Sequence, residues 1–139
     1  MDRRQRIKVI SFSHFNRFSN HPSRNFAFRC HREGNEIYPV NVLCWHPTYG
    51  TFATAGSDGT YSFWDRDAKK RLKPSAKCSA PVSAGSYSFD GNYFGYAVSY
   101  DWSKGQEAFK PSSQKNQMFL HKMNMNEMKP EVTYRSGRR

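Results

Sequence analysis

The chain has 139 residues, with 22 lysines and arginines against 11 aspartates and glutamates, a formal net charge of +11 and 16% aromatic residues. This is more aromatic than a disordered tail and, at a mean hydropathy of -0.89, less apolar than a compact domain, so we expect a chain that is part folded and part solvated. No stretch approaches the ~20 apolar residues of a membrane-spanning helix, which argues against membrane insertion and secretion.

The three cysteines, Cys30, Cys44 and Cys78, are an odd number and form no Cys-x-x-Cys pair. A disulfide framework is therefore not expected, and a reducing compartment fits better. The pairs Cys30-His31 and Cys44-Trp45-His46 lack the repeated short spacing that places four ligands around zinc. We expect no metal and no cofactor.

The excess of positive charge lies in the two ends of the chain. Residues 1–34 carry a net +6, residues 35–101 carry 0 and residues 102–139 carry +5. Basic arms favour polyanions, although the same composition also simply keeps a chain in solution, and the charge does not decide between the two. In the first arm, Phe12, Phe15 and Phe18 would suit stacking on bases, and a poorly folded leader would carry them as well.

The middle of the chain repeats itself with a period of 42 residues. Five identities fall within residues 39–58, among them Pro39-Val40 against Pro81-Val82 and Phe52 against Phe94. Alternating apolar residues predict strands at 40–45, 51–55 and 60–64 in the first unit, and at 82–89, 93–99 and 117–121 in the second. Turns are predicted at 46–50, 57–59 and 90–92.

A period of about 40–45 residues that ends in a Trp-Asp pair is the pattern of a propeller blade, and Trp64-Asp65 supplies that pair. The run 52–65 resembles a WD40 repeat. We therefore expect an all-β fold, a partial WD40 β-propeller of about two four-stranded antiparallel blades with basic flexible arms. The predicted divisions are an N-terminal arm at 1–24, a blade with a preceding outer strand at 25–78, a second blade at 79–122 with an inserted loop at 101–116, and a basic tail at 123–139.

The resemblance to WD repeats implies a buried structural tetrad formed by a histidine, a threonine, an aspartate and a tryptophan. The matching residues are His31, Thr54, Asp58 and Trp64. In such a group each buried polar atom finds a partner, and we favour this structural interpretation over a catalytic triad. The second unit carries tyrosines at the threonine and aspartate positions.

Four segments resemble the last blades of the mRNA export factors of the Rae/Gle type, the plant members above all. The segments are 25–38, 56–59, 63–65 and 99–105, the last reading Ser-Tyr-Asp-Trp-Ser-Lys-Gly. The resemblance covers roughly residues 25–121. It implies a nuclear and nuclear-pore protein, with the cytoplasm as a further location. Its implied partners are RNA and the GLEBS segment of an FG nucleoporin, and its implied process is the export of poly(A) mRNA.

The same resemblance implies a groove for RNA or an acidic peptide on the side of the propeller. Its matching residues are Phe28, Trp64, Asp65, Arg66 and Lys69. Phe28 would give apolar or stacking contacts, Arg66 and Lys69 would neutralise phosphate or carboxylate, and Asp65 would orient the cations. Without the resemblance, residues 66–71 would be interpreted as an ordinary solvated turn.

About two blades are predicted, whereas a propeller closes with four to eight. In the family, a strand from the N-terminus completes the last blade, and we expect this chain to lack it and to be a truncated piece. It could then act only as an interaction scaffold that joins complementary propeller blades, or be a non-functional copy. The sequence has no phosphate loop and no nucleophile elbow, so an enzyme is not expected.

Overall fold

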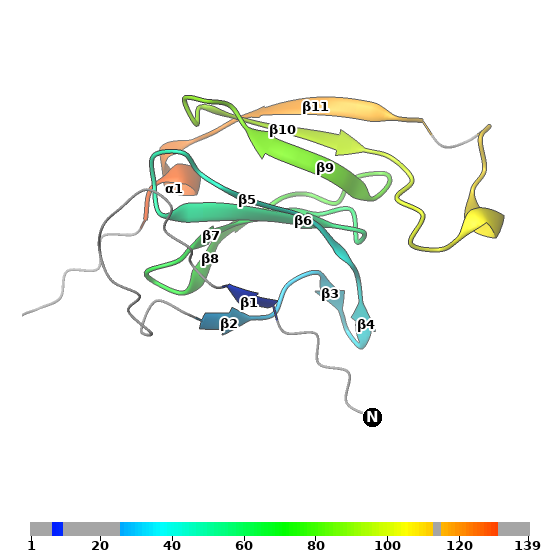
Figure 1. Ribbon diagram of the computed structural model, residues 1–139, viewed down its shortest axis with the longest axis horizontal. Helices are drawn as coiled ribbons and strands as arrows, with labels where there is room; N and C mark the ends of the chain where they lie inside the picture. Colours follow the sequence, from blue (N-terminus) through cyan, green and yellow to red (C-terminus); the bar gives the residue numbers. More distant parts are fainter. Residues whose placement is uncertain (1–6, 10–25, 113–114, 131–139) are drawn as a thin grey trace, which may run out of the picture.

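A computed structural model describes residues 7–9, 26–112 and 115–130 of the chain. Strands dominate these residues, and they form open antiparallel sheets. Figure 1 shows these sheets stacked in layers, with β9 to β11 above β5 to β8 and the short pair β1–β2 below. The prediction of an all-β fold of propeller type is confirmed, as an open stack of sheets rather than a closed ring.

The first large sheet contains four strands in chain order. They are β5 (Val40–Trp45), β6 (Thr51–Gly56), β7 (Tyr61–Asp65) and β8 (Lys70–Pro74). Aromatic and β-branched residues favour these strands, and short turns permit each to return beside the last. In the turn between β6 and β7, Gly59 has a φ of 76°, a conformation that glycine adopts without a steric penalty.

The second large sheet contains three strands in the order β11-β10-β9. They are β9 (Val82–Tyr87), β10 (Tyr93–Val98) and β11 (Gln117–Lys122). The expected four-stranded second blade is therefore one strand short within the described residues. Among the described residues, the chain after β11 turns into the short helix α1 (Met125–Met128), which lies against β8.

The remaining elements are small. The strands β1 (Ile7–Val9) and β2 (Phe26–Phe28) form one pair, β3 (Arg32–Glu33) and β4 (Glu36–Ile37) form another, and Gln106–Ala108 forms a 3-10 turn. The predicted flexible arm at 1–24 thus contributes a strand, since the backbone of β2 needs a partner and β1 supplies it. Phe12, Phe15 and Phe18 lie outside the described residues.

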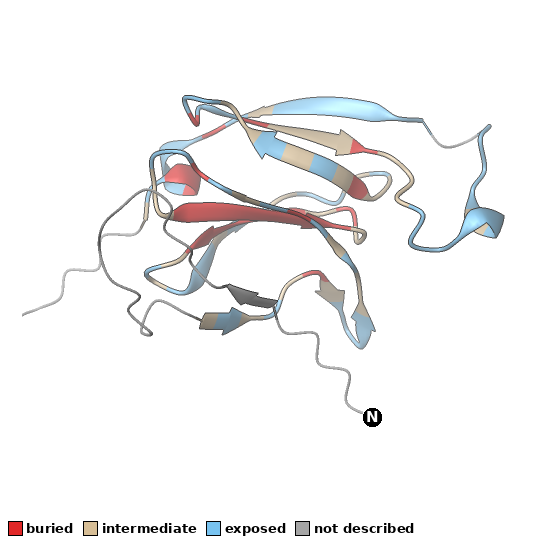
Figure 2. Cartoon of the chain, in the orientation of Figure 1, coloured by how far each residue is buried: buried red, intermediate tan, exposed pale blue. Residues whose placement is uncertain are grey.

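The main core lies between the two large sheets. Phe63 of β7 and Phe94 of β10 meet edge to face with their ring centroids 5.6 Å apart, and both are fully buried. Figure 2 shows that burial is concentrated in β6, β7 and the ends of β9 and β10. Strand β6 is buried at every position, because the second sheet covers one of its faces and β2 covers the other.

Helix α1 is held by a buried carboxylate. Glu127 accepts hydrogen bonds from Lys73 Nζ at 2.7 Å and from His121 Nε2 at 2.9 Å, and the Thr51 hydroxyl donates to the carbonyl of Met128 at 2.8 Å. Burial raises the pKa of Glu127, but the hydrogen bonds from Lys73, from the Asn124 backbone and from His121 outweigh it and hold the pKa below its ordinary value. The expected flexible tail at 123–139 is therefore packed at its beginning, because Met123 and Met128 close the core.

His46 links the two large sheets. Its Nε2 donates to the carbonyl of Gly91 at 3.1 Å, while its Nδ1 accepts from the backbone N–H groups of Thr48 and Tyr49. A Cβ at residue 91 would lie 2.3 Å from Cε1 of the His46 ring, so only glycine allows this contact. A neutral imidazole that carries its proton on Nε2 therefore has a hydrogen-bond partner at both ring nitrogens.

We expect His46 to titrate below 6.5, its ordinary pKa. Burial lowers the pKa of His46, and a proton on Nδ1 would face two N–H donors. The unfolded chain binds this proton more readily, so the contribution of His46 to stability is complete above pH 6.5 and is lost as the pH falls below that value. An NMR titration of the imidazole measures this pKa, and a value above 6.5 would contradict the assignment.

Two phenylalanines of the second sheet region provide a matched test of the core. Phe94→Ala should lower the free energy of unfolding by about 3–5 kcal/mol, because its ring is fully buried between the sheets. Phe89→Ala, at a side chain that is fully exposed in the turn before β10, should change it by less than about 0.5 kcal/mol. Urea denaturation of both variants measures the difference, and equal losses would mean that the two sheets do not pack as described.

Candidate functional site

A buried chain of hydrogen bonds joins the segment after β2 to the first large sheet. The Nδ1 of His31 lies 2.9 Å from Asp58 Oδ1, and its Nε2 lies 3.0 Å from the Thr54 hydroxyl, which also accepts the indole N–H of Trp64 at 2.9 Å. With Nδ1–H donated to the carboxylate, every polar atom of the four side chains has a complementary partner. The structure thus brings together all four predicted tetrad residues.

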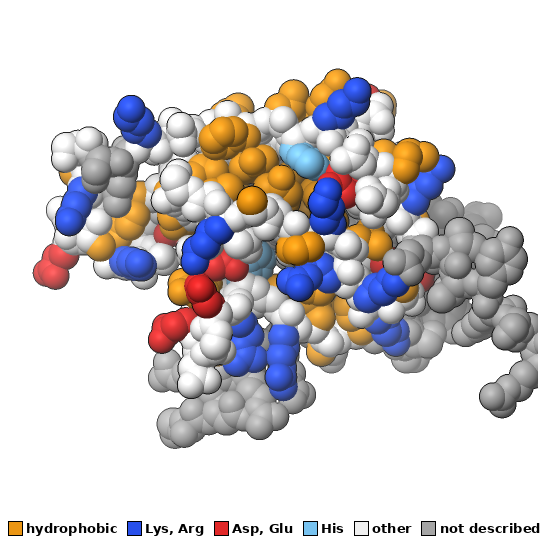
Figure 3. All heavy atoms as spheres, turned by 180° about the vertical axis from the view of Figure 1, so that it is seen from behind, with side chains coloured by type: hydrophobic (Ala, Val, Ile, Leu, Met, Phe, Trp, Pro, Cys, Tyr) orange, Lys and Arg blue, Asp and Glu red, His pale blue; other side chains and the backbone are white. Residues whose placement is uncertain are grey.

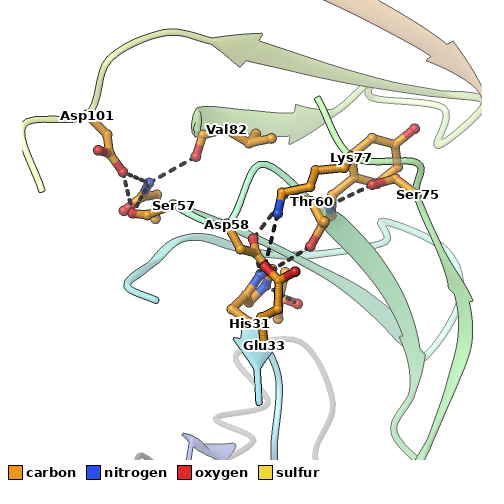
Figure 4. A network of polar contacts seen from close by, with 12 residues as sticks. His31, Glu33, Ser57, Asp58, Thr60, Ser75, Lys77, Val82 and Asp101 are labelled. Carbon is orange, nitrogen blue, oxygen red and sulfur yellow. Dashed lines mark hydrogen bonds and ion pairs between the residues drawn. The ribbon is translucent and has the colours of Figure 1, made fainter. Parts of the chain in front are cut away.

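Hydrogen bonds within the turn between β6 and β7 hold Asp58 in position to contact His31. Asp58 accepts from the backbone N–H and the hydroxyl of Thr60, at 3.1 and 2.8 Å, and Figure 4 shows its carboxylate between Thr60 and His31. Burial raises the pKa of Asp58, but the hydrogen bonds from His31 and Thr60 outweigh it and lower the pKa. A Cβ at Gly56 would lie 2.5 Å from the carbonyl oxygen of Pro39, so glycine is needed where His31 and its turn approach β6.

The geometry of the tetrad supports the structural interpretation. His31, Thr54 and Trp64 are buried, and their polar atoms are directed at one another. Such a satisfied network fixes the position of the preceding strand β2 against the sheet, and with it the position of Phe28.

The aromatic part of the predicted groove lies on the face of the first sheet opposite the main core. The Phe28 ring packs on Trp64 with centroids 4.4 Å apart and on Phe52 at 5.6 Å. Trp64 is buried beneath it, whereas Phe28 is only half-buried. Phe28 is therefore the surface aromatic, and Trp64 supports it from below.

The predicted role of Asp65 needs refinement. Its side chain is buried, and Oδ1 accepts the backbone N–H groups of Asp67 and Ala68 at 2.8 and 2.9 Å. Asp65 thus shapes the turn between β7 and β8 through its backbone, and this turn is the one that carries Arg66 and Lys69. Asp65 therefore positions Arg66 and Lys69 indirectly, by shaping the backbone of the turn that contains them.

The two predicted cations differ in their surroundings. Arg66 is half-buried, donates from Nε to Asp67 at 3.0 Å and holds its guanidinium 5.9 Å from the ring centroid of Trp45. Lys69 is exposed on a backbone with a φ of 55°. Arg66 therefore stands over an aromatic face, which is a favourable arrangement for a guanidinium, while Lys69 reaches into solvent.

Sequence reasoning missed two members of this surface. The strand register pairs Trp45 with Phe52, Phe52 with Trp64 and Trp64 with Arg71. Cross-strand partners share one face of a sheet, so these side chains form a ladder that ends in a cation on β8. The alternation of residues along β5, which places Trp45 on the same face as Leu43, could have identified Trp45. Arg71 could be identified only from the register between β7 and β8. We refer to Phe28, Trp45, Arg66, Lys69 and Arg71 as the aromatic-basic face.

The cysteines and the acidic residues do not form a metal centre in the part of the chain that the structure describes. Cys30, Cys44 and Cys78 are thiols and half-buried, and burial raises the pKa of Cys30 and of Cys44 to about 11. Among the described residues, no helix has the length and apolar character needed to cross a membrane.

Comparison with known proteins identifies relatives of part of the chain, although no family model matches it. The chain is 51% identical over 107 residues to Protein RAE1 of Arabidopsis thaliana, covering 77% of this chain and 31% of that protein. It is 47% identical over 112 residues to the Poly(A)+ RNA export protein of Schizosaccharomyces pombe, covering 78% of this chain and 32% of that one.

A third relative is the mRNA export factor of Xenopus tropicalis, 47% identical over 113 residues, which are 76% of this chain and 30% of that protein. The chain resembles one part of these export factors. The resemblance predicted from the sequence is therefore confirmed, and the chain spans about a third of the length of the curated relatives it matches.

The tetrad and the aromatic-basic face should respond differently to mutation. Trp64→Ala should lower the free energy of unfolding by about 3–5 kcal/mol, because it removes a buried ring and leaves the Thr54 hydroxyl without its donor. Arg66→Ala should lower it by less than about 1 kcal/mol, since Asp67, its partner in the ion pair, is 60% exposed. Chemical denaturation measures both, and equal losses would contradict the division between a structural and a surface role.

Proposed function

We propose that the chain is a non-enzymatic binding module that acts in mRNA export. The observation that carries this proposal is the 47–51% identity to proteins named for the export of mRNA or poly(A) RNA. A closed structural tetrad and an exposed aromatic-basic face agree with a protein that binds rather than catalyses. Because the chain spans about a third of those relatives, its own activity has to be tested on the chain itself.

The aromatic-basic face has the chemistry to bind RNA or an acidic peptide. Phe28 and Trp45 offer ring surface, Arg66 and Arg71 offer positive charge on the same side of the sheet, and Lys69 adds a cation in the turn between β7 and β8. Phosphates or carboxylates would contact the cations, and bases or apolar side chains would contact the rings. The tetrad contributes indirectly, because it holds β2 and therefore Phe28 in place.

The proposed protein partner is the GLEBS segment of an FG nucleoporin, and the proposed location is the nucleus and the nuclear pore, with access to the cytoplasm. An acidic peptide segment would match the cations of the aromatic-basic face in charge. RNA is the second proposed ligand, bound through the same face.

Binding to the aromatic-basic face can be tested by removing two of its charges. The double variant Arg66→Ala, Lys69→Ala should bind labelled single-stranded RNA or the nucleoporin segment about 10-fold or more weakly, because two charge-assisted contacts to phosphate or carboxylate are lost. The double variant Lys77→Ala, Lys122→Ala removes the same net charge at exposed positions elsewhere and should bind almost normally. Fluorescence anisotropy at moderate salt measures both. A wild-type chain that is folded and binds neither ligand would contradict the proposal.

A second candidate function is that of a scaffold that joins complementary propeller blades. The observation that favours it is the edge of the second sheet, where Met118 and Leu120 of β11 are 85% and 70% exposed. Figure 3 shows hydrophobic side chains gathered on the upper part of one face, where this sheet lies. An edge strand with apolar side chains is a template for a further strand or sheet.

The scaffold function is tested by co-purification. The chain should bind a separate protein that contains the N-terminal blades of a relative, and Leu120→Lys should weaken the complex because it places a charge on the apolar edge. Lys122→Gln, at the end of the same strand, is the control. A chain that remains a stable monomer in the presence of those blades would argue against this function.

A further inference from the structure

The loop that contains residues 99–109 carries a second aromatic surface, separate from the aromatic-basic face. Its rings contact one another, with centroid distances of 5.4 Å between Tyr100 and Trp102, 5.6 Å between Tyr100 and Phe109, and 5.1 Å between Trp102 and Phe109. Trp102 is 57% exposed and Phe109 is 37% exposed. We call these three residues the Trp102 platform.

Hydrogen bonds attach the loop that carries the platform to the first sheet. The carboxylate of Asp101 accepts hydrogen bonds from Asn41 Nδ2 at 2.8 Å, from the Ser57 hydroxyl and from the backbone N–H of Ser103 at 3.2 Å. Figure 4 shows Asp101 and Ser57 joined in this way beside Val82, whose carbonyl accepts a further bond from Asn41. The Asp101 carboxylate is therefore occupied by the donors that fasten the loop to the first sheet.

A second contact fixes the far side of the loop. The hydroxyl of Tyr100 donates to the carbonyl of Gly105 at 2.6 Å. Trp102 lies between these anchors at a φ of 63°, a left-handed conformation that a bulky aromatic residue adopts at a steric cost. A large ring is thus presented to solvent on a strained backbone, where glycine would be the unstrained choice.

A cavity of about 580 Å³ adjoins the platform. It lies between this loop, the turn at Ser57 and the linker before β9, and Tyr100 belongs both to its lining and to the platform. Lys104, Lys110 and the hydroxyl-bearing Ser79 and Ser103 also line it. Its volume lies within the range of small-ligand sites.

We propose that the Trp102 platform and its cavity bind single-stranded RNA, with a base stacked on Trp102 and an adjacent phosphate in the cavity near Lys104. Stacking on exposed rings beside cations is how single-stranded nucleic acids are bound, because every base has a flat face. This inference rests on the proposed function insofar as the ligand is RNA, but its residues are separate from the aromatic-basic face.

The decisive variant is Trp102→Gly in the full chain. Glycine tolerates the left-handed backbone, so the melting temperature should be unchanged or raised, while loss of the stacking ring should weaken binding about 5- to 100-fold. The probe is a fluorescein-labelled single-stranded oligoadenylate of about eight nucleotides, within the usual range of site sizes. Phe89→Ala, which removes a fully exposed ring from another loop, is the matched control and should bind normally.

Salt dependence separates stacking from charge. Trp102→Gly should leave the slope of log K against log [salt] unchanged, whereas Lys104→Gln should make the slope shallower by about 0.7, as expected for one lost phosphate contact. Trp102→Phe should recover most of the affinity, because it restores a stacking ring.

The outcomes distinguish this site from the aromatic-basic face. RNA binding that falls in Trp102→Gly and not in Phe89→Ala supports the inference. RNA binding that falls in Arg66→Ala, Lys69→Ala and is normal in Trp102→Gly overturns it and leaves the proposed function standing. Binding of an acidic peptide, in place of RNA, that depends on Trp102 overturns the choice of ligand, and a folded chain that binds no RNA overturns both RNA proposals.

Discussion

The fold of the first sheet depends on one buried imidazole. His31 connects the Asp58 turn, the Thr54 hydroxyl of β6 and, through that hydroxyl, the indole of Trp64 in β7. A polar group in this position is tolerated only because each of its hydrogen bonds is made, since an unpaired one would cost about 1–3 kcal/mol. These hydrogen bonds attach the segment after β2 to the sheet.

The two faces of the first sheet have different surroundings. One face is closed by the second sheet through Phe63 and Phe94, and Met128 of helix α1, which Glu127 anchors, completes that core. The other face carries the cross-strand ladder from Trp45 to Arg71, covered in part by Phe28. Burial thus stabilises the molecule on one side, and the rings left at the surface, with their neighbouring cations, are the features available for binding.

The strands of both sheets could be predicted from the sequence because their signals are local. Alternation of apolar residues and turns containing Gly59 or Gly91 placed six strands near their observed positions. The four tetrad residues could be named because a repeat motif fixes their spacing along the chain. Their hydrogen bonds lie within the blade that carries the motif.

The elements that were missed depend on contacts between distant residues. Helix α1 has only four residues, and it is held by Lys73 from a strand 54 residues earlier. The membership of Arg71 in the aromatic ladder follows from strand register, which no local pattern specifies. The second sheet ends at three strands in the described residues because the chain beyond β11 packs across β8 instead of returning beside it.

The most direct test of the tetrad as the organising contact is the exchange rate of the three indole N–H protons. By NMR in deuterated solvent, the Trp64 proton, donated to Thr54 in a buried site, should exchange orders of magnitude more slowly than that of Trp102, which is 57% exposed. The proton of the partly exposed Trp45 should also exchange faster than that of Trp64. Three similar rates in a folded chain would contradict the account, because the network around His31 would then not be closed.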